Sequence, residues 1–377
     1  MRKSIFYSLN KILLYLAIFF AIFMPADSLN IKKGLFFIVI LMNTPIIYYD
    51  IKEWKFPCIC FYAMIYPLML FMFSFISGGY LQESISNTYF WGYLFFIFII
   101  DRYKYDYEKM LINVLLALAL FILFLVGADF WGLIDVNTHY IPSYLHSAGE
   151  AMIGRVDWYP LKYIIFLKAS PLLVFALFYY LEKKKYMFTV LIFIALVFSG
   201  TRANLIFPSL FIVVYLWITN EKLTKIMIVI ASIGLSPLLL SGIKILNKAK
   251  ETSEVIKYGH YISIIHELKD PINFLFGMGY GTIFYTSGLS DYSANTELSY
   301  LDFFRKSGFF NFVLLIFFIV RPIGLLYKSR KTAPLCAYLS YLLIAGTNPL
   351  LVSSTSMIGY VYIYSFFLKI NGGDESV

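Results

Sequence analysis

The segment just before the apolar run 309–320 combines a carboxylate with basic side chains. On a helix, Glu297 and Arg305 would share one face, two turns and about 12 Å apart. A carboxylate can take the proton of an attacking hydroxyl, and a guanidinium binds phosphate through paired donors, so the two could bracket a reacting centre. Asp302 is also spaced to pair with Arg305 or Lys306, which leaves a helix held by surface ion pairs as the alternative.

A second cation, Arg202, ends the short turn Ser199–Arg202 between two apolar runs. The planar guanidinium matches a phosphate group better than an ammonium group does, so this position is a candidate phosphate ligand. The alternative is an arginine at the membrane interface that reaches lipid headgroups.

Glycines alternate through the segment Phe276–Gly281, at Gly277, Gly279 and Gly281. A tight turn is one interpretation, and a close approach of the backbone to a ligand is the other. No βαβ pattern surrounds the glycines, which excludes a dinucleotide-binding fingerprint. Lys168 falls inside an apolar run, where a charge is costly unless it is paired or hydrated, so either a functional role or an outward-reaching side chain is expected.

The sequence predicts no metal site and no disulfide. The four histidines lack metal-ligand spacing, and no Asp-x-Asp pair occurs that would hold a metal-bound nucleotide sugar. Cys58, Cys60 and Cys336 lie in or beside apolar runs rather than in long polar loops.

The composition places these residues in a membrane protein. Of the 377 residues, 60% are hydrophobic and only 14% are charged, with a mean hydropathy of +0.75. Soluble domains carry about 25% charged residues, so lipid must replace water around much of this chain. The net charge of +9 is then explained by basic cytoplasmic loops, and no nucleic-acid partner is expected.

The fold expected is all-α, with about 12 transmembrane helices of roughly 20 apolar residues each and one large periplasmic loop. The predicted spans are 5–24, 34–49, 57–77, 85–100, 110–134, 160–181, 186–200, 203–219, 225–242, 307–327, 333–348 and 353–370. The predicted divisions are an N-terminal transmembrane bundle of about nine helices over 1–242, the loop 243–306, and C-terminal helices with a cytoplasmic tail over 307–377.

Lysine and arginine are concentrated in alternate short loops, which places both termini in the cytoplasm of a bacterial inner membrane. The loop 243–306 and the shorter loop 135–159 then lie outside. Within the larger loop, apolar residues recur at helical spacing over 252–268, and Asp270-Pro271 ends that pattern. We therefore expect an amphipathic surface helix there.

The order of these elements resembles the O-antigen polymerase and O-antigen ligase superfamily. The resemblance lies in the turn Ser199–Arg202, the loop segment 259–270, the turn Phe276–Gly281, and a re-entry helix over 297–308. Glu-x-x-Tyr-Leu-x-x-x-Arg, from Glu297 to Arg305, is more like the polymerase branch, because the ligases typically have a histidine in place of Glu297.

The resemblance implies transfer of a growing glycan from undecaprenyl diphosphate to a lipid-linked repeat unit on the periplasmic face, without a cofactor. Glu297 is then the expected catalytic base, with a pKa raised at a partly dry membrane rim. The expected diphosphate ligands are Arg202, Arg305 and Arg155. The residues expected to contact substrate are Gly277, Gly279, Tyr300 and Lys168. A protein that regulates chain length is the expected partner, besides the membrane lipid.

Three other functions remain open on the sequence. An O-antigen ligase would transfer the glycan to lipid A core. A flippase or other transporter of lipid-linked oligosaccharides usually has two similar halves and charges in many spans, and this chain has neither. The third is an assembly subunit without catalytic activity.

Overall fold

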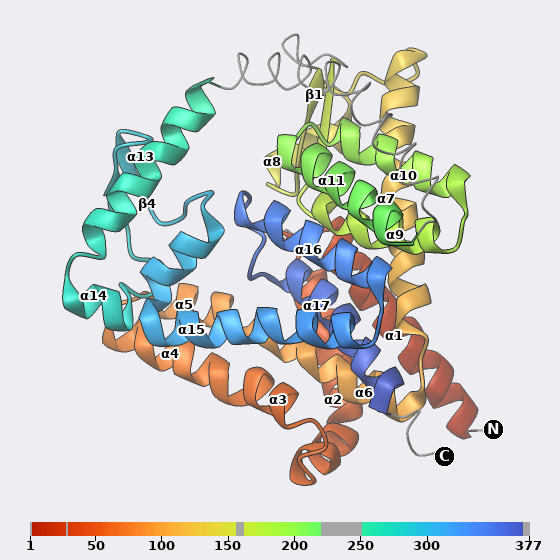
Figure 1. The fold of residues 1–377 in the computed structure, drawn as a ribbon, viewed down its shortest axis with the longest axis horizontal. Helices are drawn as coiled ribbons and strands as arrows, with labels where there is room; N and C mark the ends of the chain where they lie inside the picture. The colour runs from red at the N-terminus through yellow and green to blue at the C-terminus, as the bar shows by residue number, and fades with distance from the viewer. Residues whose placement is uncertain (1, 28, 156–161, 220–250, 372–377) are drawn as a thin grey trace.

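The computed structural model describes residues 2–27, 29–155, 162–219 and 251–371, and these are mostly helical (Figure 1). Within them, six helices are long and apolar enough to cross a membrane, so the chain has the helices of a membrane protein. They are Ile5–Phe23, Ile31–Lys52, Pro57–Ile76, Tyr107–Phe130, Arg202–Thr219 and Ser299–Lys328. The shorter apolar helices are Ser170–Glu182, Tyr186–Phe198 and Thr332–Gly346.

Helices make up most of the described chain, and four short strands interrupt them. In chain order, the helices are α1 (Arg2–Phe23), α2 (Ile31–Lys52), α3 (Pro57–Cys60), α4 (Tyr66–Ile76), α5 (Leu81–Thr88), α6 (Phe96–Tyr103), α7 (Tyr107–Phe130), α8 (Tyr140–Ser147), α9 (Leu173–Glu182), α10 (Tyr186–Phe198), α11 (Arg202–Thr219), α13 (Glu251–Glu267), α14 (Pro271–Phe276), α15 (Ser299–Lys328), α16 (Thr332–Gly346) and α17 (Ser354–Asn371). The strands are β1 (Ala151–Arg155), β2 (Tyr163–Leu167), β3 (Phe284–Thr286) and β4 (Asp291–Ser293). A wide helical turn joins α3 to α4, and tight 3-10 turns join α5 to α6 and lead into α9.

Helices α13 and α14 and the pair β3–β4 form a lobe at the left of Figure 1, attached to the start of α15. From this lobe α15 runs into the helical body beside α4. Helix α9 packs against α7, α10 and α16, and α16 also packs against α11. The lobe therefore meets the body of the protein where α15 begins.

The predominantly helical fold predicted from the sequence is confirmed, but the chain is not all-α, because its described residues also form two short antiparallel sheets. The prediction of one continuous helix over 160–181 is also wrong. Its first part is β2, rich in β-branched and aromatic residues, which pairs with β1 so that Ala151 lies opposite Leu167. A helix starts only at Ser170-Pro171, because proline suits a first helical turn. The span predicted over 225–242 lies outside the described residues.

Helix α15 is broken at Gly308, whose φ of 76° and ψ of 175° are not helical. Next to the break, the carbonyl oxygens of Arg305 and Lys306 accept hydrogen bonds from the N–H groups of Met278 (2.8 Å) and Gly279 (3.0 Å). A glycine is needed at the break, because a Cβ on Gly308 would overlap the backbone of α14. The predicted domain boundary at 306/307 falls inside this helix.

Tyrosine hydroxyls join the helices around α15. Pro322 lacks an N–H group, and the carbonyl oxygen four residues earlier, on Phe318, accepts a hydrogen bond from the Tyr364 hydroxyl at 2.8 Å. Such bonds contribute on average about 0.6 kcal/mol in membrane proteins, so several are needed to fix one helix. The others are Tyr62 to Leu314, Tyr66 to Asn311 and Tyr338 to Ile319.

The surface helix predicted over 252–268 is confirmed as α13, Glu251–Glu267. Asp270 lies after its end and caps α14, accepting a hydrogen bond from the N–H group of Ile272 at 2.9 Å, with Pro271 in the first turn. The buried His260 of α13 contacts the Thr286 hydroxyl through its Nδ1 atom at 2.6 Å. This contact holds α13 against β3.

Candidate functional site

The glycine-rich turn Gly277–Gly281 is clamped between α15 and the junction of α4 with α5. A Cβ on Gly277 would lie 2.5 Å from the carbonyl oxygen of Lys306. Further along the turn, the N–H group of Tyr280 donates to the Ser74 hydroxyl at 2.7 Å. The positive φ angles of the glycines are therefore explained by packing against the chain's own backbone. The contact with substrate expected for Gly277 and Gly279 stays a prediction.

Arg305 is fully buried, and its guanidinium is surrounded by protein groups. It donates to the Asp302 carboxylate at 2.9 Å and to the carbonyl oxygen of Ala294 at 2.8 Å. Its Cζ atom also lies 4.2 Å from the ring centre of Phe284. The guanidinium thus ties the loop after α14 to α15. This arrangement disagrees with the expectation that Arg305 holds a diphosphate, because a ligand would have to displace these contacts.

Lys306 is a basic residue near the start of α15, and it faces a cavity. Its ammonium group lies 2.5 Å from Asp302 and donates to the Asn295 side chain at 2.6 Å. The predicted pairing of Asp302 with Arg305 or Lys306 is therefore confirmed, and the carboxylate pairs with both. The pairs are buried rather than exposed at the surface.

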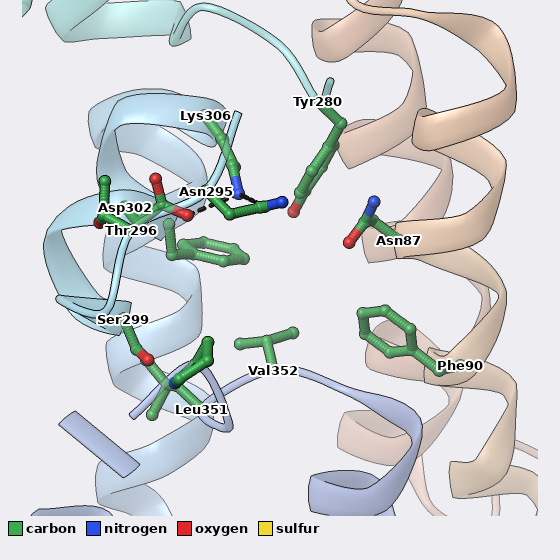
Figure 2. A pocket seen from close by; sticks show the side chains of 12 residues that line it. Asn87, Phe90, Tyr280, Asn295, Thr296, Ser299, Asp302, Lys306, Leu351 and Val352 are labelled. Carbon is green, nitrogen blue, oxygen red and sulfur yellow. Dashed lines mark hydrogen bonds and ion pairs between the residues drawn. The ribbon is translucent and has the colours of Figure 1, made fainter. Parts of the chain in front are cut away.

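The cavity beside Lys306 encloses about 120 Å³ and is drawn in Figure 2. Amide, hydroxyl and aromatic side chains converge on it from α5, from the glycine-rich turn, from the start of α15 and from the segment before α17. The lining residues are Asn87, Phe90, Tyr280, Asn295, Thr296, Ser299, Asp302, Phe303, Lys306, Pro349, Leu351 and Val352. A second cavity of about 290 Å³ shares four of these residues and extends to Lys32 and Lys33 at the start of α2.

Arg202 and Glu297 are linked through one turn of α13. The guanidinium of Arg202, the first residue of α11, lies 2.6 Å from the Glu254 carboxylate. One turn later, the ammonium group of Lys257 lies 3.2 Å from the Glu297 carboxylate. Arg202 and Glu297, both selected from the sequence, thus form ion pairs with residues one turn apart on the same helix.

Glu297 differs from its expected setting in two ways. It precedes α15, which begins at Ser299, so it does not share a helical face with Arg305. The Ser299 hydroxyl donates to the carbonyl oxygen of Asn348, and this contact fixes the start of the helix against the end of α16. The Glu297 side chain is 52% exposed and paired with Lys257, so the protein's own side chains do not bury this carboxylate.

Arg155, at the end of β1, is paired with a buried carboxylate of α7. Its Nε and Nη2 atoms donate to the two Asp129 oxygens at 2.7 and 2.6 Å, a bidentate pair. The hydrogen bonds from Arg155 to Asp129 raise the pKa of the guanidinium above its usual value. Because the pair fixes β1 to the end of α7, the structure supplies a structural role for Arg155, and diphosphate binding there stays a prediction.

Two further candidates lie away from the cavity of Figure 2. Lys168 follows β2 in a turn, where its N–H group donates to the carbonyl oxygen of Glu150 at 3.2 Å. The premise that it lies inside a membrane helix is wrong. Tyr300 points toward α16, and its hydroxyl donates to the carbonyl oxygen of Leu342 at 3.3 Å. A ring carbon of Tyr300 would lie 2.8 Å from a Cβ placed on Gly346.

Among the residues that the structure describes, no group of three or more His, Cys, Asp or Glu side chains could hold a metal ion. The three cysteines are free thiols. No protein-family model matches the sequence, and no curated protein matches it. Membership in the superfamily named above therefore remains a proposal based on the order of the motifs.

Sequence reasoning missed the polar lining of the cavity. Asn87, Tyr280 and Thr296 come from separate segments, and none of them was selected as a site residue, although Tyr280 lies between two glycines of the turn Phe276–Gly281. One signal was present, since the predicted topology already placed all three on the same side of the membrane, Asn87 at the outer end of the span 85–100 and the other two in the loop 243–306. That topology did not specify which side chains of these segments face one another.

Proposed function

We propose that the chain is a membrane-embedded glycosyltransferase that extends a surface polysaccharide on the periplasmic face of a bacterial inner membrane. It would transfer the growing glycan from undecaprenyl diphosphate to a lipid-linked repeat unit. The observation that carries this proposal is the line of ion pairs from Arg202 through Glu254 and Lys257 to Glu297. It brings a candidate phosphate-binding cation and a proton acceptor to one helix, and the acceptor, Glu297, directly follows Thr296, which lines the cavity.

The reaction requires few groups. A sugar hydroxyl of the repeat unit attacks the anomeric carbon of the donor glycan, and a carbon–oxygen bond forms. The bond from that carbon to the diphosphate oxygen breaks, and undecaprenyl diphosphate leaves with the electron pair. Glu297 takes the hydroxyl proton, and Arg202 stabilises the negative charge on the leaving diphosphate. The bond that breaks supplies the energy, so neither a nucleotide nor a metal is needed.

Glu297 suits the role of base better than Asp302, the nearest carboxylate of the cavity. Both Asp302 oxygens are held by cations, Oδ1 by Arg305 and Oδ2 by Lys306, and the side chain is buried. A proton on Asp302 would break these contacts. Glu297 is paired with Lys257 at the surface and is half exposed, so it can turn toward an incoming hydroxyl.

The arrangement of the cavities supports the proposed sidedness of the chain, with the large loop on the periplasmic face. Five separate segments line the two adjoining cavities, and the charge pattern assigns all of them to the outer face or to outer span ends. They are 25–33, 86–90, 280, 295–306 and 349–354. A third cavity is lined by Lys55, Arg321 and other residues that the same pattern places at the cytoplasmic end.

Complementation of a polymerase-null strain tests the function. The wild-type gene is expected to restore long glycan chains on lipopolysaccharide, whereas Glu297→Gln, at equal protein level, is expected to leave single repeat units. A protein that acts as a ligase would give a different null phenotype, namely no repeat units on lipopolysaccharide. Full-length polysaccharide from Glu297→Gln would remove the catalytic assignment.

A further inference from the structure

The cavity of Figure 2 contains two buried hydroxyl groups that have no hydrogen-bond partner in the protein. Tyr280 is 4% exposed and Thr296 is 5% exposed, and neither hydroxyl finds a donor or an acceptor. In Figure 2 the Tyr280 hydroxyl points into the space between Asn87 and Asn295. Burying a hydroxyl without a hydrogen-bond partner is unfavourable, so two such groups at one cavity indicate a site that a polar ligand completes.

The charges at the cavity favour a neutral ligand over an anion. The ammonium group of Lys306 is already neutralised by Asp302, whose Oδ2 atom lies 2.5 Å away. The other oxygen of Asp302 is paired with Arg305, which does not line the cavity. An added phosphate would compete with Asp302 for the same cation. Sugar hydroxyls can instead donate and accept at the same time, which suits unpaired hydroxyl and amide groups.

The wall of the cavity also suits a sugar ring. Phe90 and Phe303 supply apolar faces, while Asn87, Asn295 and Ser299 supply polar groups. The adjoining cavity of about 290 Å³ is close to the lower end of the range for small-molecule sites, about 300–1,000 Å³, and offers room for further rings. An oligosaccharide could therefore extend from the first cavity into the second.

We propose that this cavity binds the sugar of the acceptor repeat unit through the hydroxyls of Tyr280 and Thr296. The inference rests on the proposed function for the identity of the acceptor. Thr296 precedes Glu297 directly, and neighbouring Cα atoms are about 3.8 Å apart, so the proposed base belongs to the same short segment that lines the cavity. The diphosphate of the donor is bound separately, at Arg202.

Two conservative substitutions isolate the hydroxyls. Tyr280→Phe and Thr296→Val each remove an oxygen that makes no hydrogen bond in the protein, so neither is expected to lower the melting temperature. Tyr93→Phe is the matched control, because the Tyr93 hydroxyl is also buried and without a partner but does not line the cavity.

Calorimetry on the full-length protein in lipid nanodiscs measures the effect. The probes are the repeat-unit oligosaccharide released by mild acid from the producing strain, and inorganic pyrophosphate. Wild-type protein and Tyr93→Phe are expected to bind the oligosaccharide equally well. Tyr280→Phe and Thr296→Val are each expected to weaken oligosaccharide binding roughly two- to tenfold, as the loss of one hydrogen bond does, and to leave pyrophosphate binding unchanged.

The outcomes separate this inference from the proposed function. Equal oligosaccharide affinity in all four proteins, no oligosaccharide binding by wild type, or a loss confined to pyrophosphate would each overturn the sugar site. If the two cavity variants bind normally while Glu297→Gln fails to polymerise, only the sugar site is wrong. If the cavity variants lose oligosaccharide binding while Glu297→Gln polymerises normally, the catalytic assignment is wrong and the sugar site stands.

Discussion

Glu254 and Lys257 lie one turn apart on α13, and their ion pairs reach two different parts of the chain. Glu254 holds the arginine that begins α11, and Lys257 holds the carboxylate that precedes α15. Two residues 95 positions apart in the sequence, Arg202 and Glu297, are thereby kept near each other. Substituting the two partners of one of these ion pairs separately should therefore show whether the pair has a structural or a catalytic role.

Arg202→Ala and Glu254→Ala break the same ion pair but should differ in activity. Exposed pairs contribute about 0–1 kcal/mol, so both variants should retain nearly wild-type stability. Arg202→Ala removes a group that stabilises the leaving diphosphate and should lower the polymerisation rate about 10²-fold. Glu254→Ala keeps the guanidinium and should remain active. Polymer yield at matched protein level is the measurement, and equal losses in both variants would show that the pair has only a structural role.

Arg305→Ala should destabilise the protein rather than only reduce its activity. The change leaves Asp302 with one cation instead of two in a buried site, and breaking such a pair costs about 3–5 kcal/mol. The variant should accumulate at a lower level in the membrane and melt earlier in detergent. Stable Arg305→Ala protein with normal folding and no activity would instead favour the direct role in diphosphate binding that the sequence predicted.

Gly308→Ala and Gly324→Ala test the break in α15 with the same chemical change. Alanine at Gly308 must adopt a positive φ and meets the backbone of α14, which should cost about 1–3 kcal/mol or more. Gly324 lies in the same helix, and no neighbouring atom lies within 4 Å of the point that an alanine Cβ would occupy. Alanine there should be neutral or stabilise the protein by about 0.5–1 kcal/mol. Melting temperatures of the two purified variants provide the comparison.

The stability of the lobe should depend on pH through His260. Burial lowers the pKa of this imidazole below its usual value, with Glu297 and Asp302 acting in the opposite direction. Because the folded state binds the proton less readily than the unfolded state, stability falls as the pH drops below the ordinary histidine pKa of about 6.5. His260→Asn should flatten the dependence of the melting temperature on pH around that value. A wild-type melting temperature that rises on acidification would contradict the assignment.

Labelling of introduced cysteines tests the orientation. In a background without Cys58, Cys60 and Cys336, a cysteine at the exposed Leu289 should react with an impermeant maleimide from the periplasm. A cysteine in place of Lys183, beyond α9, should react only after the membrane is opened. The opposite pattern would place the proposed site in the cytosol and remove the function.

Much of the helical organisation could be predicted from the sequence, because apolar periodicity and proline positions act locally. The helix over 252–268 and the apolar helices of α1, α2 and α7 are examples. The run from 163 to 167 shows the limit, since β-branched residues in an apolar run fit either a strand or a span. Its partner, β1, decided the outcome, and hydropathy does not reveal pairing between segments.

The site was predicted less completely than the helices. Arg202 and Glu297 both pair with α13, but the orientation of Arg305 depends on Asp302, Ala294 and Phe284 together. The burial of the Arg305 guanidinium follows from how the lobe packs, and helical spacing in the sequence does not predict it. The unpaired Tyr280 hydroxyl was equally hidden from the sequence, because a missing partner is defined only when the surroundings are known.

The short helix α10 has a consequence for the membrane around it. Its 13 residues extend about 20 Å, whereas the hydrocarbon layer is about 30 Å thick. Helix α9 is also short, but its neighbours cover it, while α10 exposes Met187, Val190 and Ile194. Hydrophobic mismatch therefore falls mainly on α10, and a thicker bilayer would strain it. Because α10 leads through Ser199–Thr201 into Arg202, acyl-chain length should influence how this arginine is presented.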